Sequence, residues 1–142
     1  MKRIISVLFL CLCVCSVPAQ SQKVLTVVDQ FGSPILFVSD TAVSDGKANA
    51  IFSVVGSTVY ADDGTVVMKI TEGRVTGEGG KLLYTVRGNK VYIGSDKVSS
   101  AVFTKEAING DSFSYGILNL LSAPSRRQQV IATCILLMVH SL

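Results

Sequence analysis

Residues 55–70 read VGSTVYADDGTVVMKI, and residues 71–86 read TEGRVTGEGGKLLYTV. The two stretches align Val59 with Val75 and Gly64 with Gly80, and the same period of sixteen runs through five copies across residues 23–102. A fixed period indicates one structural unit copied along the chain, whose members need one another to bury an apolar face. The recurring columns are Val27, Val43, Val59, Val75 and Val91; Gly32, Ala48, Gly64, Gly80 and Asp96; Leu36, Phe52, Met68, Tyr84 and Ser100; and Val38, Val54, Ile70, Val86 and Val102.

Asp63-Gly64 predicts that each copy is a β-hairpin. The pair is typical of a two-residue type I′ turn, which needs positive φ at both central residues. Such a turn places Asp62 opposite Thr65. Because side chains alternate along a strand, the apolar columns then share one face, which we expect to line the core. In the last regular copy, the expected inward residues are Val91, Ile93, Val98 and Val102.

After the regular repeats, residues 103–118 keep the length of a copy but not its register. Asn109-Gly110 is a turn signal there, and the apolar residues are displaced by one position. Terminal repeats are commonly atypical. This unit is therefore expected to be a degenerate sixth hairpin or a closing strand.

The segment 123–142 contains an apolar run, Val130–Val139, that is hydrophobic on nearly every side. As a helix capped by Ser125, ten residues rise only about 15 Å, which is half a bilayer core, so no membrane span is expected. Hairpin arms of about five residues stand roughly 17 Å tall, a matching length. We expect a helix buried along the axis of a ring of hairpins and packed in the same domain. A final β-strand is the alternative, since valine, isoleucine and threonine are frequent.

The first nineteen residues have the pattern of an export signal. Lys2 and Arg3 precede an apolar stretch, and residues 17–19 form a small-residue cleavage pattern. We therefore expect signal peptide 1–19, a repeat domain over residues 20–122, and a periplasmic or extracellular location.

Cysteine usage fits an exported domain without an internal disulfide. Removal of the signal leaves Cys134, in an apolar run, as a small buried hydrophobe. Lipid anchoring is not expected. The lipid-attachment pattern needs a small residue directly before the cysteine, but large aliphatic residues precede Cys11, Cys13 and Cys15.

Charge and motifs exclude several function classes. The chain has 13 basic and 10 acidic residues, and loss of Lys2 and Arg3 leaves 11 against 10, so no nucleic-acid partner is expected. His140 is the single histidine, lies near the end without metal-ligand spacing, and is expected to be a frayed terminal residue. Asp62 and Asp63 are better explained as turn residues. We expect no enzyme activity and no catalytic, cofactor-binding or metal-binding residues.

Tyr60 and Tyr92 are the candidate binding surface. They occupy the same outward position two copies apart, among other outward apolar residues that a monomer would rarely expose. A protein, glycan or envelope partner would fit such a surface. Mutual cover between neighbouring hairpins is the alternative.

The four columns, with the Asp63-Gly64 and Gly79-Gly80 turns, resemble the five-fold β-flower family, small exported bacterial proteins built from short hairpins around a pseudo-five-fold axis. The resemblance covers Lys23 to Val102. It implies a mainly β fold of five hairpins in a pseudo-five-fold ring and carries no activity.

The sequence therefore predicts an exported, non-enzymatic β-repeat protein that acts as a structural or binding module. The alternative is an envelope-associated protein whose apolar C-terminal segment engages membrane or a partner.

Overall fold

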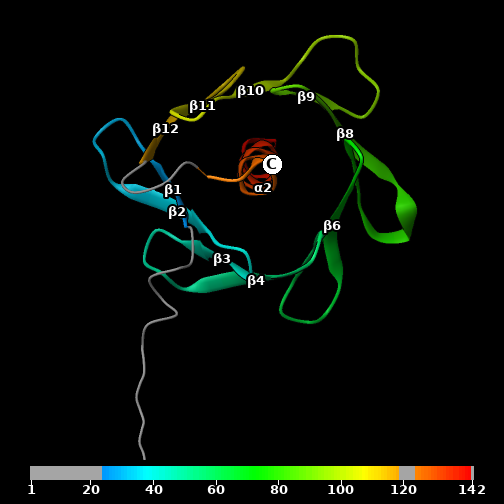
Figure 1. The fold of residues 1–142 in the computed structure, drawn as a ribbon, viewed down its shortest axis with the longest axis horizontal. Helices are drawn as coiled ribbons and strands as arrows, with labels where there is room; N and C mark the ends of the chain where they lie inside the picture. The colour runs from blue at the N-terminus through cyan, green and yellow to red at the C-terminus, as the bar shows by residue number, and fades with distance from the viewer. Residues whose placement is uncertain (1–23, 119–123, 142) are drawn as a thin grey trace, which may run out of the picture.

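A computed structural model describes residues 24–118 and 124–141 and contains a closed barrel of twelve antiparallel strands around one helix (Figure 1). The predicted signal peptide, residues 1–19, lies outside the described residues. The elements are β1 (Leu25–Val28), β2 (Pro34–Val38), β3 (Ala42–Asp45), β4 (Ala50–Val55), β5 (Thr58–Tyr60), β6 (Val66–Thr71), β7 (Arg74–Thr76), the 3-10 turn η2 (Glu78–Gly80), β8 (Leu82–Arg87), β9 (Lys90–Ile93), β10 (Ala101–Phe103), β11 (Ala107–Gly110), β12 (Ser114–Leu118) and α2 (Arg126–His140).

Each strand pairs with its neighbours in sequence, and β1 pairs with β12 to close the ring. The turns therefore fall into two sets at opposite ends of the barrel. We call the end with the turns after odd-numbered strands the long-turn rim, and its turns are residues 29–33, 46–49, 61–65, 77–81, 94–100 and 111–113. The other end is the short-turn rim, with turns at residues 39–41, 56–57, 72–73, 88–89 and 104–106.

Four turns of the long-turn rim share one pattern of backbone hydrogen bonds. In each, the N–H of the first residue donates to the carbonyl four residues later, and its carbonyl accepts the N–H three residues later. The donor of this second bond has positive φ: Gly32 at 81°, Ala48 at 67°, Gly64 at 86° and Gly80 at 82°. Strand register then shifts after Val27, Val43, Val59 and Val75. The sixteen-residue period is thus a period of turns and bulges as well as of apolar residues.

The predicted two-residue turn at Asp63-Gly64 is wrong in detail. The turn has three residues, because the N–H of Ala61, not that of Asp62, donates to the Thr65 carbonyl at 2.9 Å. The register shift further along the strands compensates for the extra residue and restores the predicted pairing of Val59 with Met68. Beside the turn the predicted face is wrong: Val66 pairs with the outward Tyr60, and Val67 packs against the core instead. The Thr65 hydroxyl and the Thr65 N–H both donate to the Asp63 carboxylate. These two bonds lower the pKa of the carboxyl group, and the hydroxyl has the larger effect.

The apolar columns line the interior of the barrel. The valine column is fully buried, with 0% exposure at Val27, Val43, Val59, Val75 and Val91. Most members of the other two apolar columns are also buried, namely Leu36, Met68, Tyr84, Val38, Val54 and Val86. The predicted inward position of these columns is therefore confirmed for the first four copies.

The fifth copy departs from the prediction. Two of its predicted inward residues are exposed: Ile93 at 46% and Val98 at 79%. The turn at residues 94–100 is longer than its counterparts, and β10 consequently presents Ala101 and Phe103 to the core in place of Val102. A one-residue change of register exchanges the two faces of a strand, which explains the difference.

The ring contains one strand pair more than five hairpins supply. Residues 107–118 form β11 and β12, with Ile108 and Ile117 buried. The expected Asn109-Gly110 turn is wrong, because both residues lie in β11. Their strand turns at residues 111–113 instead, where the Gly110 N–H donates to the Phe113 carbonyl. The pseudo-five-fold arrangement is not confirmed by this twelve-stranded ring.

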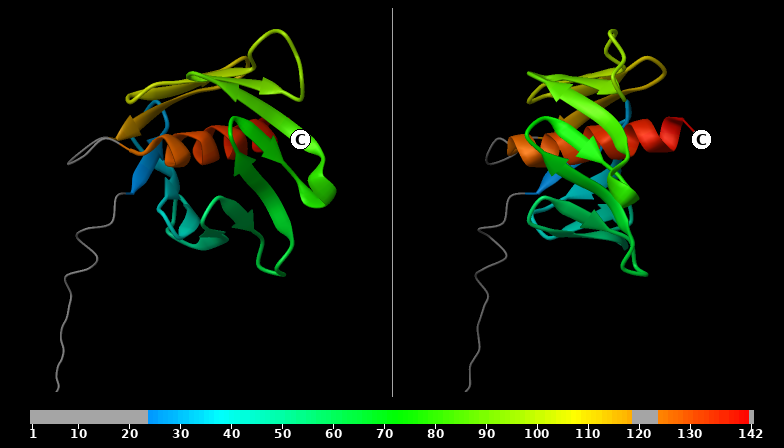
Figure 2. Two further views of the ribbon diagram at one scale, coloured as in Figure 1. Left: turned by 45° about the vertical axis from the view of Figure 1, so that its right-hand side comes forward. Right: turned by 90° about the vertical axis from the view of Figure 1, so that its right-hand side faces the viewer.

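The C-terminal segment forms α2, a helix that runs through the ring along its axis (Figure 2). Ser125 and Gln128 form a reciprocal capping box at its start. The helix is buried from Gln128 to Leu137, so it fills the space that the strands enclose. The helix prediction is confirmed and the strand alternative is wrong. Among the described residues, no helix has both the length and the apolarity needed to cross a membrane.

The first turn of α2 attaches the helix to the short-turn rim. The side chains of Arg126, Arg127, Gln128 and Gln129 donate to the backbone carbonyls of Gly88, Gly56, Val38 and Thr104, at 2.6, 2.7, 2.9 and 2.9 Å. Successive helix residues point about 100° apart, so four consecutive side chains reach four different hairpins. We call these four side chains the anchor residues. They satisfy rim carbonyls and fix the axial position of the helix.

Candidate functional site: an aromatic pocket where the barrel closes

A pocket of about 350 Å³ lies on the long-turn rim. It is built from three segments that are distant in sequence: the β1–β2 turn, the end of the β11–β12 hairpin and the last turn of α2. Because β1 pairs with β12, the first two segments are neighbours at the seam where the barrel closes. The lining residues are Asp29, Gln30, Phe31, Ser112, Phe113, Ser114, Tyr115 and His140. We call this site the seam pocket.

Three rings of the seam pocket pack against one another. The Phe113 and His140 ring centroids are 4.7 Å apart with planes 19° from parallel, and those of Phe113 and Tyr115 are 5.7 Å apart at 25°. Tyr115 Oη and His140 Nε2 are joined by a hydrogen bond of 2.8 Å. The Phe113 ring is therefore nearly parallel to both of the others, whereas the Tyr115 and His140 planes are tilted by 40°.

The local backbone gives the Phe113 ring its position. A Cβ atom added to Gly110 would collide with the edge of that ring, so glycine at this position lets the ring fold over the strand as it does. His140 is delivered by α2, whose fifteen residues cover about 22 Å from the short-turn rim to the long-turn rim. The expectation of a frayed His140 is therefore wrong: its ring is stacked and hydrogen-bonded.

Phe31 forms the exposed side of the seam pocket. It stands at the tip of the β1–β2 turn, and 82% of its surface is exposed. The Asp29 carboxylate shapes this turn, since its Oδ1 accepts the N–H groups of Phe31 and Ser33 at 2.9 and 3.0 Å. The turn thus holds an aromatic ring in solvent beside the packed rings of the pocket.

The polar groups of the seam pocket suit hydrogen bonding more than bond-making chemistry. Its lining offers a carboxylate, an amide and two serine hydroxyls, and the Ser114 hydroxyl donates to Asn109 Oδ1 at 2.6 Å. Within residues 24–118 and 124–141, no three His, Cys, Asp or Glu side chains gather closely enough to hold a metal ion. The arrangement can stack against a flat ligand and bind its polar edge.

The buried titratable groups lie away from this pocket, in the barrel core. Burial raises the pKa of the Cys134 thiol, which is fully enclosed, so the thiol stays protonated and unreactive at neutral pH. Burial, with a smaller contribution from Cys134, raises the pKa of Tyr84 to about 12. Both groups serve as packing residues, as expected for Cys134.

Tyr60 and Tyr92, the predicted binding residues, lie on β5 and β9. Three strands separate β5 from β9 in the ring, so the structure does not bring the two rings together in one patch. Both side chains are half-buried, and the Arg87 guanidinium lies over the Tyr92 ring, 5.1 Å from its centroid. Their role in binding stays a prediction.

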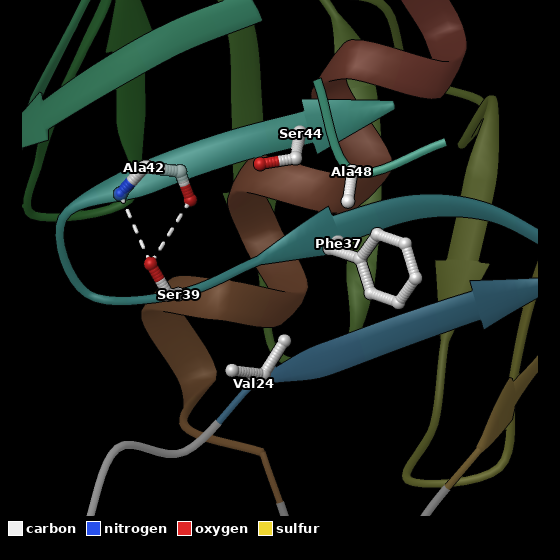
Figure 3. Close-up of a pocket in the computed structure, with 6 residues that line it drawn as sticks. All are labelled: Val24, Phe37, Ser39, Ala42, Ser44 and Ala48. Atoms are coloured by element: carbon white, nitrogen blue, oxygen red, sulfur yellow. Dashed lines mark hydrogen bonds between the residues drawn. The ribbon is translucent and has the colours of Figure 1, made fainter. Parts of the chain in front are cut away.

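A second hollow, of about 260 Å³, lies on the outer face of β1–β3 (Figure 3). Its lining includes the outward ring of Phe37, which Val24 and Ala48 flank. Ser39 Oγ, at the edge, accepts the Ala42 N–H and donates to the Ala42 carbonyl. The lining residues are small, apolar or hydroxyl-bearing, and no titratable side chain is among them. This hollow therefore offers fewer recognition groups than the seam pocket.

The seam pocket was not found from the sequence, although one signal was present. A helix that starts at one rim and matches the barrel in length must deliver its last residues to the other rim, which places His140 there. No pattern in the sequence indicated that β1 pairs with β12.

Comparisons with known protein families, with curated proteins and with solved structures give no match for this chain.

Proposed function

We propose that this protein is an exported, non-enzymatic binding module whose ligand site is the seam pocket. The observation that carries the proposal is the packed ring cluster of Phe113, Tyr115 and His140 beside a solvent-exposed Phe31. Because α2 fills the barrel interior, a ligand has to bind at a rim or on the outer wall. Export is supported by the signal pattern of residues 1–19.

We further propose that the scaffold consists of five sixteen-residue hairpin units followed by a divergent sixth pair, β11 and β12. The register shifts and positive-φ turn residues that recur in the first four units support this division. As part of the same proposal, we relate these hairpin units to those of the five-fold β-flower family, which the sequence resembles. The divergent pair supplies Phe113 and Tyr115, so the unit that departs from the repeat is the one that equips the site.

The alternative, an envelope protein whose apolar segment leaves the core to engage membrane, is less well supported. Residues Gln128 to Leu137 are buried, and the anchor residues tie α2 to four hairpins. Detergent-phase partitioning of residues 20–142 separates the two: recovery in the aqueous phase supports the binding module, and recovery in the detergent phase supports the alternative.

Ligand capture tests the seam pocket directly. Residues 20–142 are incubated with a small-molecule extract of the native cells and examined by native mass spectrometry. We expect a noncovalent adduct on the wild-type protein that is lost in Phe31→Ala and retained in Val98→Ala, a matched removal of an equally exposed apolar side chain from another turn of the same rim. An adduct that persists in Phe31→Ala, or no adduct at all, would contradict the proposal.

Export has its own test. Amino-terminal sequencing of the protein recovered outside the cytoplasm should begin at Gln20. Full-length protein retained in the cytoplasm would contradict it.

A further inference from the structure

We propose that the seam pocket binds a pyranose ring of a neutral saccharide, stacked against its aromatic side chains. This inference rests on the proposed function and names the chemical class of its ligand. Three properties of the pocket carry it: the geometry of the rings, the kind of polar groups around them, and the charge of the lining.

The rings provide a surface for an apolar ring face. One face of a pyranose is rich in C–H groups, and such a face packs against the electron-rich plane of an aromatic ring. Phe113 and His140 are nearly parallel, the Phe113 ring folds over Gly110, and the hydrogen bond to Tyr115 holds the His140 ring. A preformed stacking surface loses little conformational freedom when the ligand binds.

Phe31 adds a second aromatic surface. Its 82% exposure leaves most of the ring open to contact on binding, and Asp29 holds the turn that carries it. A ligand seated in the pocket would remove part of this apolar surface from water, which favours binding. Phe31 is therefore expected to contribute to affinity without contributing to the barrel core.

The polar residues match the hydroxyl groups at the edge of a sugar. Each sugar hydroxyl donates one hydrogen bond and accepts others, so it needs donors and acceptors close together. The lining provides the Asp29 carboxylate, the Gln30 amide, and the hydroxyls of Ser112 and Ser114. A carboxylate accepts about four hydrogen bonds, so the two that Asp29 takes from its own turn leave capacity for a ligand.

Charge and size narrow the ligand class. The described residues that line the pocket include Asp29 and no lysine or arginine, so an anionic ligand would meet a carboxylate without a fixed positive charge. The volume of about 350 Å³ is near the lower end of the 300–1,000 Å³ of small-molecule sites, a size that suits one or two sugar rings. A quaternary ammonium ion is the competing ligand, because aromatic rings beside a carboxylate also favour cations.

The test is titration of residues 20–142 with defined probes, followed by calorimetry and by saturation-transfer NMR. The neutral probes are maltotriose, cellotriose and the trimer of N-acetylglucosamine; choline and sialyllactose represent cationic and anionic ligands. We expect at least one neutral trisaccharide to bind, with saturation transfer strongest at ring C–H protons. Phe31→Ala should weaken that binding at least tenfold, and the matched Val98→Ala variant should change it less than twofold.

Three outcomes would overturn the inference: binding of choline or sialyllactose without a neutral saccharide, saccharide affinity unchanged in Phe31→Ala, or no binding of any probe. Each leaves the proposed function standing if the native extract still yields an adduct that depends on Phe31. Loss of that adduct as well would overturn both.

Discussion

The two rims of the barrel use α2 in different ways. At the short-turn rim, the anchor residues bind the carbonyls of four hairpins, and the helix start is held in place. At the long-turn rim, α2 contributes His140 to a ring cluster beside the exposed Phe31. The two ends of the helix therefore have different roles: its start holds the fold together, and its last turn completes a pocket.

Removal of α2 should have the largest effect. Deletion of residues 126–142 takes away the buried side chains from Gln128 to Leu137 and exposes the apolar inner face of the barrel to water. We expect loss of cooperative thermal unfolding and strong binding of a hydrophobic dye, measured by circular dichroism and fluorescence. A truncated protein that is soluble and melts cooperatively would show that the strands form a barrel without the helix.

Gln128→Ala should reveal the importance of the short-turn rim. Gln128 is 1% exposed, and its amide donates to the Val38 carbonyl at 2.9 Å, so the substitution leaves a buried acceptor without this donor. We expect a loss of about 2–3 kcal/mol in unfolding free energy, measured by urea denaturation. Arg126→Ala is the matched control, because its exposed side chain should contribute about 1 kcal/mol or less. Equal losses in the two variants would contradict the role of the buried anchor.

The core near the long-turn rim should respond to alkaline pH through Tyr84. Burial raises its pKa from 10.0 to about 12, so the folded state favours the neutral phenol. The stability that this group contributes is complete below pH 10 and is lost as the pH rises from 10 to 12, because the unfolded chain ionises first. The melting temperature of Tyr84→Phe should therefore fall less steeply with pH over this range than that of the wild type. Parallel curves would argue against a buried phenol.

The turns of the long-turn rim offer the smallest effects, in opposite directions. Gly64→Ala should destabilise by about 1 kcal/mol, because φ is 86° and an added Cβ meets nothing within 4 Å, so backbone strain alone acts. Ala48→Gly relieves the same strain at φ 67° but raises the conformational entropy of the unfolded chain. We therefore expect the unfolding free energy to rise by about 0.5 kcal/mol. Urea denaturation measures both. Changes of the same sign would contradict a shared turn geometry.

The sequence predicted the wall of the barrel better than its closure. The valine column and the buried helix could be read from periodicity because each depends on local spacing of apolar residues. The turn type at Asp63-Gly64 could not, because a three-residue turn followed by a register shift gives the same pairing of Val59 with Met68 as a two-residue turn. The sixth strand pair could be given only as one of two alternatives, since β11 and β12 had lost the period that marks the other units.

The candidate site was harder to predict for a physical reason. It depends on bringing Phe31, Phe113 and His140 to one pocket. These residues share no spacing, and they line the same pocket only because β1 pairs with β12 and α2 has the length of the barrel. Tyr60 and Tyr92 do share a spacing, and they lie on strands that are far apart in the ring. Periodicity identifies equivalent positions in successive repeats. In a ring, such positions lie on different hairpins and are therefore far apart.

The pairing of β1 with β12 has a consequence for how the protein acquires its structure. The ladder between Thr26 and Leu118 joins the two ends of the strand region, and the helix that fills the interior is encoded after both. Synthesis therefore delivers the centre of the molecule last, and hairpins that emerge earlier remain without the surface they pack against. We expect folding to be late, because β1 can complete its pairing only after β12 has been made, and the inner face of the barrel is covered only after α2 has been made.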